Sequence, residues 1–284
     1  MADWTIGLST GCFGDRPLVD ALMPIRASGF HLLEICSLPS HLDYRDAQAC
    51  DHAARRIAEL ELDAYSFHAP FAEHIDITAL DEGARQHAIG EIALAVEAAA
   101  RLGASYFVLH PGPEATGLPR SERLDRMEHA AASLDHIADR CRQLGVRLVL
   151  ENMLPHLFSG HVRELLWLLG ALANTEVGIC LDTGHAFLSG DLRTVAHKLA
   201  GHLAMIHASD NRGKFDDHLP AGDGDVPWAD LWRHLSETRF EGAIVLEIVG
   251  GGEVDEVLGR ARRGRSYLRR LSHAQKSGAQ RERR

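Results

Sequence analysis

The sequence contains no apolar run that approaches the ~18 residues needed to span a bilayer. Its N-terminus, Met1-Ala2-Asp3-Trp4, has no basic flank followed by an apolar segment, which argues against a secretory signal. We therefore expect a soluble, cytoplasmic protein with no membrane partner.

Cysteine is scarce and is not arranged in pairs. The five cysteines are odd in number, and no two of them form a Cys-x-x-Cys motif. This pattern predicts neither a disulfide framework nor a zinc ribbon. We expect reduced and mostly buried thiols at Cys12, Cys36, Cys50, Cys141 and Cys180.

Positive charge is also scarce in most of the chain. The net charge is −10, and ten of the 30 Lys and Arg residues lie after residue 259 together with a single acid. The first 259 residues thus carry 20 basic and 39 acidic side chains, and such a body repels a phosphate backbone. Nucleic acid is therefore not the expected partner, and we interpret residues 260–284 as the end of the last helix and a disordered basic tail.

What the sequence does contain is a regular alternation of strand-like and helix-like stretches, repeated eight times over residues 1–259. This alternation predicts an α/β protein, a single (β/α)8 TIM barrel. A doubly wound open sheet is the main rival, but it would gather its functional residues at one crevice. The sequence leaves open whether the barrel forms a homo-oligomer.

Six of the predicted strands end in a potential metal ligand. The strands that we expect near residues 64–67, 106–109, 146–150, 177–181, 203–206 and 243–246 lead into a histidine or an acid. The active site of a TIM barrel lies at this carboxyl end of its strands. The six residues are His68, His110, Glu151, Asp182, His207 and Glu247.

Four of these residues form the predicted metal site. Glu151, Asp182, His207 and Glu247 come from four successive strands and supply three carboxylates and one imidazole. Hard oxygen ligands with one nitrogen suit Mn²⁺, Mg²⁺ or Co²⁺. Without a cation, three converging carboxylates would raise one another's pKa.

A second group is richer in nitrogen. His68, His110, His185, Asp216 and His218 combine imidazole with carboxylate, which is typical of zinc sites. These residues are either further metal ligands or groups that hydrogen-bond and contact a substrate, and their types alone do not decide between the two.

The ordered set of motifs resembles the xylose isomerase-like TIM barrel superfamily, which contains sugar and sugar-phosphate isomerases and epimerases and the related endonuclease IV branch. The motifs are His68-Ala69-Pro70, His110-Pro111-Gly112, Glu151-Asn152, Leu181-Asp182-Thr183-Gly184-His185, His207-Ala208-Ser209-Asp210-Asn211-Arg212-Gly213, Asp216-Asp217-His218-Leu219-Pro220-Ala221-Gly222-Asp223-Gly224 and Leu246-Glu247.

The resemblance to the epimerases implies one divalent metal, Mn, Mg, Co or Zn, on Glu151, Asp182, His207 and Glu247. Glu151 and Glu247 would also be the catalytic base and acid on a small polyhydroxylated carbonyl substrate. A metal on adjacent hydroxyl and carbonyl oxygens acidifies the intervening C–H and stabilises the enediolate. We thus expect a metal-dependent sugar or sugar-phosphate isomerase or epimerase, whose substrate-binding residues are His68, His110, His185 and Arg212.

The endonuclease IV branch implies an alternative function, a zinc phosphodiesterase that acts on abasic-site DNA. There, nine positions hold three zinc ions, and all nine matching residues are present here. The acidic body argues against this function. A non-catalytic sugar-binding barrel is the third hypothesis, and it would leave the strand-end ligands idle.

Three other residues receive structural interpretations. Glu34, near the end of the second strand, is expected to be a solvent-facing or salt-bridged acid rather than a substrate contact. Trp228 and Trp232 lie one helical turn apart, which favours packing against the barrel over stacking on a sugar.

Overall fold

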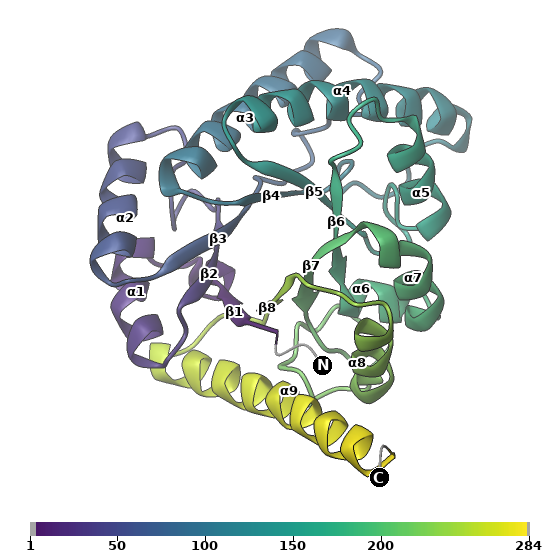
Figure 1. Cartoon of the computed structure of the whole chain (residues 1–284). Coiled ribbons are helices and arrows are strands. Elements are labelled where there is room, and N and C mark those ends of the chain that lie inside the picture. The colour runs from purple at the N-terminus through teal and green to yellow at the C-terminus, as the bar shows by residue number, and fades with distance from the viewer. Residues whose placement is uncertain (1–3, 283–284) are drawn as a thin grey trace.

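The computed structural model describes the backbone of residues 4–282 and the side chains of residues 4–274. Its eight strands pair in parallel, in chain order, and the first closes onto the last (Figure 1). The predicted (β/α)8 barrel is thus confirmed, and the open-sheet rival is wrong. The strands are β1 (Ile6–Ser9), β2 (Leu32–Cys36), β3 (Asp63–His68), β4 (Tyr106–Leu109), β5 (Arg147–Glu151), β6 (Gly178–Asp182), β7 (Leu203–Ala208) and β8 (Ala243–Leu246).

Helices surround the barrel on its outer side (Figure 1). Local sequence determines several of their ends: the Asp81 side chain accepts a hydrogen bond from Ala84 N, and Gly103 ends the same helix with a φ of 78°. The helices are α1 (Leu18–Ala27), α2 (Ala47–Glu59), α3 (Glu82–Leu102), α4 (Arg123–Gln143), α5 (Val162–Ala171), α6 (Thr183–Leu188), α7 (Leu192–Leu199), α8 (Trp228–Glu237) and α9 (Val254–Glu282), with short 3-10 turns η1 (Thr10–Phe13), η2 (Arg120–Glu122) and η3 (Ala200–His202).

Helix α6 is not among the elements that the sequence pattern predicts. Its N-cap is Asp182, whose carboxylate accepts a hydrogen bond from His185 N at 2.6 Å. A six-residue helix is too short to show a clear apolar period, which is why the sequence pattern misses it. The helix fixes His185 beside the end of β6.

An apolar layer fills the interior of the barrel beneath the polar strand ends. Neighbouring residues on a strand point to opposite faces, so a side chain two positions before a strand-end ligand points to the same face. Val149, Cys180, Met205 and Val245 each lie two residues before an acid or a histidine and belong to one buried apolar cluster. This cluster plugs the barrel beneath its polar mouth, and it consists of Leu32, Val108, Val149, Cys180, Ala204, Met205, Ala243 and Val245.

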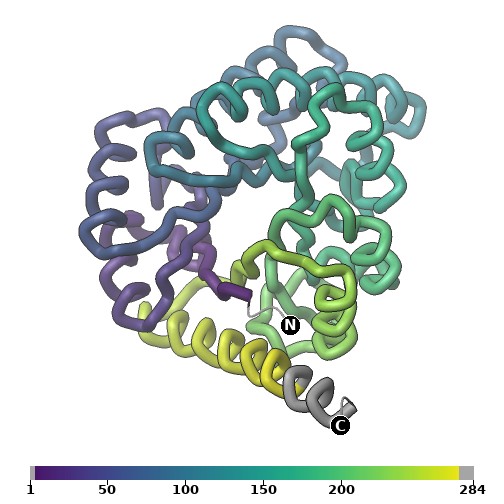
Figure 2. Tube along the Cα trace, viewed as in Figure 1, coloured from purple at the N-terminus to yellow at the C-terminus, as the bar shows by residue number. Residues whose placement is uncertain are grey.

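Helix α9 runs along the outside of the barrel next to α1 and α8 (Figure 2). Leu268 on this helix is fully buried, and Ser272 accepts a hydrogen bond from the Trp232 indole nitrogen at 3.0 Å. The side chains after residue 274, which make up most of the predicted disordered tail, lie outside the described residues. The disorder of this tail therefore stays a prediction.

The expectations about cysteines and membrane-spanning segments concern residues that the structure describes. All five cysteines are buried and free, in agreement with the prediction of reduced, buried thiols. None of the helices between residues 4 and 282 is long and apolar enough to cross a membrane.

Both tryptophans of α8 belong to the core, as expected, since Trp228 and Trp232 are each 1% exposed. Trp232 also makes an edge-to-face contact with Trp4, with ring centroids 5.0 Å apart.

We predict that Trp232→Ala lowers the free energy of unfolding by ~3–5 kcal/mol, because it leaves a large cavity. Trp167→Ala is the matched control, since Trp167 is 41% exposed. Equal urea midpoints for the two variants would contradict this assignment.

Candidate functional site

All six predicted strand-end ligands lie at the carboxyl end of the barrel. His68, Glu151 and Asp182 are the last residues of β3, β5 and β6. His110 and Glu247 directly follow β4 and β8, and His207 is the penultimate residue of β7, as the sequence lists them. Closure of the barrel therefore brings residues separated by up to 179 positions to one mouth.

The central donor group consists of Glu151, Asp182, His207 and Glu247, as predicted. One ligand atom from each residue lies within 4.8 Å of the others. His207 Nδ1 is 3.0 Å from Glu247 Oε2 and 3.4 Å from Glu151 Oε2.

Three buried atoms of this group lack a well-formed hydrogen bond within the described chain: Glu151 Oε2, His207 Nδ1 and Glu247 Oε2. Unsatisfied buried polar atoms are costly, and here they converge on one point. Three carboxylates and one imidazole are a donor set that suits a hard divalent cation. The residues present therefore fit the predicted metal.

Burial and neighbouring charges shift the pKa values of all four residues in the central donor group. Burial raises the pKa of the Asp182 carboxyl group to about 6. Burial acts in the same direction on Glu247, but the neighbouring His207 outweighs it and lowers the pKa of Glu247 to about 2. Burial also raises the pKa of Glu151, but His207 outweighs this effect and holds the pKa well below its usual value. Burial alone would lower the pKa of His207, but the surrounding carboxylates, including Glu34, raise it well above normal.

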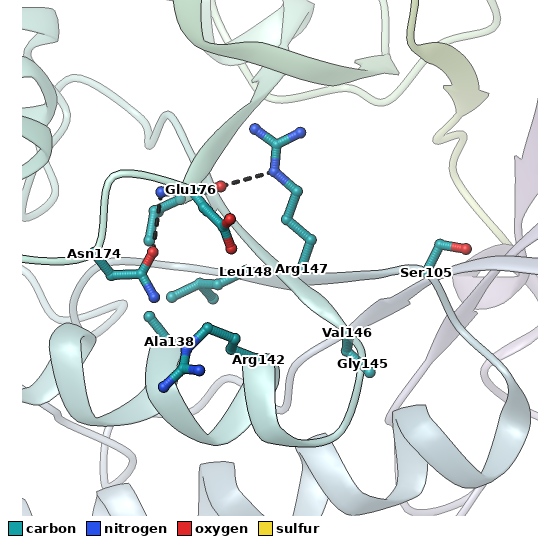
Figure 3. A pocket seen from close by; sticks show the side chains of 10 residues that line it. Ser105, Ala138, Arg142, Gly145, Val146, Arg147, Leu148, Asn174 and Glu176 are labelled. Carbon is teal, nitrogen blue, oxygen red and sulfur yellow. Dashed lines mark hydrogen bonds between the residues drawn. The ribbon is translucent and has the colours of Figure 1, made fainter.

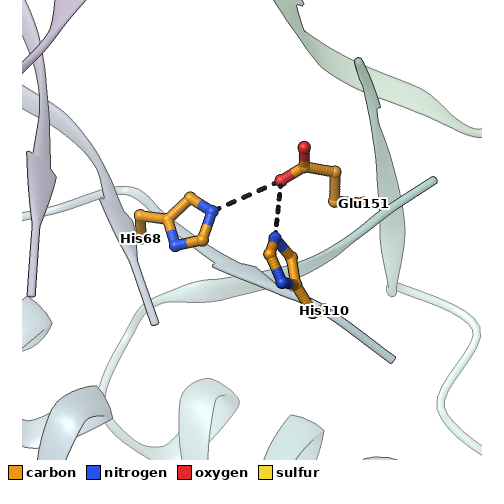
Figure 4. Close-up of side chains that lie close together, drawn as sticks. All are labelled: His68, His110 and Glu151. Atoms are coloured by element: carbon orange, nitrogen blue, oxygen red, sulfur yellow. Dashed lines mark ion pairs between the residues drawn. The ribbon is translucent and has the colours of Figure 1, made fainter. Parts of the chain in front are cut away.

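A second donor group shares Glu151 with the first. The Nε2 atoms of His68 and His110 lie 3.4 and 3.5 Å from Glu151 Oε2. Figure 4 shows both imidazole rings pointing toward this carboxylate. Burial opposes protonation of His110, but the carboxylates of Glu114 and Glu151 raise its pKa to about 9. Phe71, which is 41% exposed, packs near both imidazole rings.

A third donor group lies on α6 and on the loop after β7. Asp216 Oδ2 is 3.2 Å from His185 Nε2 and 2.9 Å from His218 Nε2. Burial would lower the pKa of His218, but Asp216 and Glu247 raise it to about 10. His218 has a φ of 44°, an uncommon conformation for a residue other than glycine.

Asp210 is buried and holds the loop that carries Asp216 and His218. Its carboxylate accepts hydrogen bonds from the backbone nitrogens of Gly222 and Val226 and from the Trp228 indole nitrogen, at 2.8 to 3.0 Å. Asp210 lies within the motif that begins at His207, and its residue type alone predicts no role for it. An acid followed by small and turn residues is the only sequence signal of such an anchor.

Arg212 does not join these groups in the structure. Its side chain is exposed, and its described contact is a backbone hydrogen bond to Asp217 Oδ2 at 3.3 Å. The predicted substrate-binding role of Arg212 stays a prediction, as do the roles of His68, His110 and His185.

Glu34 is fully buried, so of the two expected environments the solvent-facing one is wrong and the ion-paired one is correct. Its Oε2 lies 2.8 Å from His207 Nε2 and accepts a hydrogen bond from Ser66 Oγ at 2.9 Å. With Glu34 Oε2 as the acceptor, Nε2 of His207 donates this hydrogen bond and Nδ1 faces the central group. Glu34 therefore orients His207.

A cavity of about 440 Å³ lies at the opposite end of the barrel. It is lined by residues that precede the strands, among them Ser105 and Val146, and Figure 3 shows Arg147 Nε donating a hydrogen bond to Glu176 O there. The chemistry of a TIM barrel is located at the carboxyl end, so we do not assign this cavity to the active site.

Comparison with known proteins identifies the family of this barrel. A family model described as xylose isomerase-like TIM barrel matches residues 24–271. The chain belongs to this family. Among its relatives, an uncharacterised protein of Methanocaldococcus jannaschii is 28% identical over 255 residues, which are 86% of this chain and 84% of that one. An inosose dehydratase of Lacticaseibacillus casei is 27% identical over 143 residues, which are 43% of this chain and 47% of that one.

A solved structure of a D-tagatose 3-epimerase-like protein has the same fold. It superposes with a TM-score of 0.84 at 22% sequence identity, and the match covers 97% of this chain and 99% of that one. At this level of identity the likeness supports the barrel fold and carries no further assignment.

We predict that divalent metal binding strengthens with rising pH. A metal ligand must be a neutral imidazole or a carboxylate, whereas the raised pKa of His207 keeps this imidazole protonated at neutral pH. Below about pH 6, protonation of Asp182 would weaken binding further. Calorimetric titration with Mn²⁺ in buffers of different ionisation enthalpy should show proton release near pH 7. An affinity that is constant from pH 6 to 8 would contradict this prediction.

Glu34→Gln should weaken Mn²⁺ binding by about 10–100-fold, because the carboxylate that orients His207 is lost while the side-chain volume is kept. Glu61→Gln serves as the control, since this side chain is 84% exposed on the surface. Calorimetry on both folded variants measures the effect, and equal affinities would show that Glu34 has only a structural role.

Proposed function

We propose that the protein is a metal-dependent isomerase or epimerase that acts on a small polyhydroxylated carbonyl compound by proton transfer. The observation that carries this proposal is the position of two glutamates: Oε2 of Glu151 and Oε2 of Glu247 lie 3.4 and 3.0 Å from the same imidazole nitrogen of His207. The lowered pKa values of both carboxyl groups keep them ionised at neutral pH, so each is able to accept a proton.

The proposed roles follow from these charges. Glu151, Asp182, His207 and Glu247 would hold the cation, which supplies positive charge to substrate oxygens that become negative. One glutamate takes the proton of the C–H bond next to the carbonyl group. The other glutamate first accepts a proton from water or a substrate hydroxyl group, and it then returns this proton to carbon. His68, His110 and His185 offer N–H groups to substrate oxygens, and Arg212 would need to turn inward to do the same.

The family supports this choice without deciding it. The relative named inosose dehydratase and the structure of a D-tagatose 3-epimerase-like protein carry names from the chemistry of small polyhydroxylated compounds. The acidic composition of residues 1–259 suits a small substrate better than a nucleic acid, whose many phosphate groups this acidic chain would repel.

A second candidate function is an endonuclease IV-like phosphodiesterase with up to three zinc ions. The observation that favours it is the presence of two further donor groups, His68 with His110 and Glu151, and His185 with Asp216 and His218. The metal content of the purified protein separates the two functions, since about one divalent ion per chain supports the isomerase and about three zinc ions support the phosphodiesterase.

Glu151→Gln and Glu247→Gln should each lower the turnover number by about 100-fold or more, because a positioned acid or base contributes that much to a proton transfer. In D₂O, the wild-type protein should incorporate deuterium next to the carbonyl group of a ketose, and both variants should lose this exchange.

Phe71→Leu is the control, since Phe71 packs beside His68 and His110 but carries no proton. Full exchange in both glutamine variants would refute the roles of the two glutamates. Absence of exchange with every ketose tested, together with nicking of abasic-site DNA by the wild type, would favour the phosphodiesterase.

A further inference from the structure

A cavity of about 640 Å³ lies between the loops that follow β4 and β5. One wall comes from residues between Ala115 and Arg123, and the other from residues between Pro155 and Glu164. Both loops leave the carboxyl ends of their strands, so the cavity opens on the same end of the barrel as the candidate metal centre.

The lining of this cavity is basic, although the chain as a whole carries a net charge of −10. Three arginines and two histidines line it, and the single acid among the lining residues is Glu164. Glu164 is already occupied, since its two carboxylate oxygens accept hydrogen bonds from Arg123 at 2.7 and 2.6 Å.

Of the three arginines that line the cavity, Arg120 and Arg163 have no side-chain partner among the described residues. In the described part of the chain, neither guanidinium group makes an ion pair or a side-chain hydrogen bond, and both side chains are exposed. His156 and His161 line the same cavity and add N–H donors. The cavity therefore presents two uncompensated positive charges.

Packing holds the walls of the cavity in place. The Phe158 ring lies under the Arg123 guanidinium at 5.7 Å, and a Cβ atom at Gly112 would lie 2.3 Å from this ring. A Cβ atom at Gly160 would lie 2.1 Å from Leu154 O, so only glycine allows this close approach of the loop. Preformed concave sites of this kind are typical of ligand-binding pockets.

Residues at the wall of the cavity are close in sequence to residues of the candidate active site. Pro155, on its wall, lies four residues after Glu151, so their Cα atoms are at most about 14 Å apart. The Phe158 wall also packs on Gly112, two residues after His110. A group bound in the cavity would thus lie at the rim of the same mouth as the metal ligands.

We propose that this cavity binds the phosphate group of a phosphorylated substrate, with Arg120 and Arg163 as its charged ligands. The proposal rests on the isomerase or epimerase function and narrows its substrate class to phosphate monoesters of polyhydroxylated carbonyl compounds. A phosphate monoester carries nearly two negative charges at neutral pH, which two unpaired guanidinium groups balance. A phosphodiester of nucleic acid carries one charge and would meet the acidic remainder of the chain.

The first experiment measures binding of inorganic phosphate and of glycerol 3-phosphate to the full-length protein by calorimetry, with equal metal content in all variants. The double variant Arg120→Gln with Arg163→Gln should bind both ligands about tenfold or more weakly, because it loses charge-assisted hydrogen bonds that contribute to the binding free energy. Arg55→Gln with Arg193→Gln is the matched control, since both residues are exposed and lie outside this cavity. Equal phosphate affinities in the two double variants would overturn the proposal.

The second experiment compares a ketose with its phosphate monoester as substrates. The Arg120 and Arg163 double variant should raise KM for the phosphorylated substrate about tenfold and leave KM for the free ketose unchanged. An equal rise for both substrates would overturn the proposal, and so would a loss of binding to an abasic-site DNA duplex that exceeds the loss for glycerol 3-phosphate. If no ketose is turned over while phosphate binding still depends on the two arginines, the proposed reaction fails and the anion site stands.

Discussion

The buried negative charge at the mouth of the barrel must be balanced, and the rest of the site is arranged around this requirement. Glu34, Glu151 and Asp182 are at most 1% exposed. Isolated carboxylates at such depth would take up protons, because burial penalises the charged form. Histidines on neighbouring strands balance this charge when they are protonated, and the pKa values of His110 and His207 are raised accordingly. His207 lies between Glu34 on one side and the central donor group on the other. A divalent cation would replace part of this protonic charge.

Strands and loops contribute differently to this arrangement. The strands place apolar side chains in the plug and polar side chains one layer above it. The loops then decide what the mouth recognises, as the loop held by Asp210 brings Asp216 and His218 to His185. A family that places the same donors at the strand ends can therefore host different reactions through its loops.

The distribution of charge separates the two parts of the mouth. The strand ends concentrate carboxylates and imidazoles, whereas the loops after β4 and β5 concentrate arginine. A cation and an anionic substituent of one substrate would be held at different places, so that neither competes with the other for the same ligands. This separation is consistent with a substrate that has a reactive polyhydroxylated end and a charged end.

The sequence by itself determined the barrel and its ligand types, because strand periodicity reports which side chains face inward and six of the eight strands lead into an identifiable histidine or acid. The donor groups of Glu151, Asp182, His207 and Glu247 followed from that pattern. Only the tertiary structure decided the partners: Glu34 and His207 are 173 positions apart, and no local pattern encodes a contact across a closed barrel. The same holds for the cavity that Arg120 and Arg163 line, since it exists only where two loops from different strands pack together.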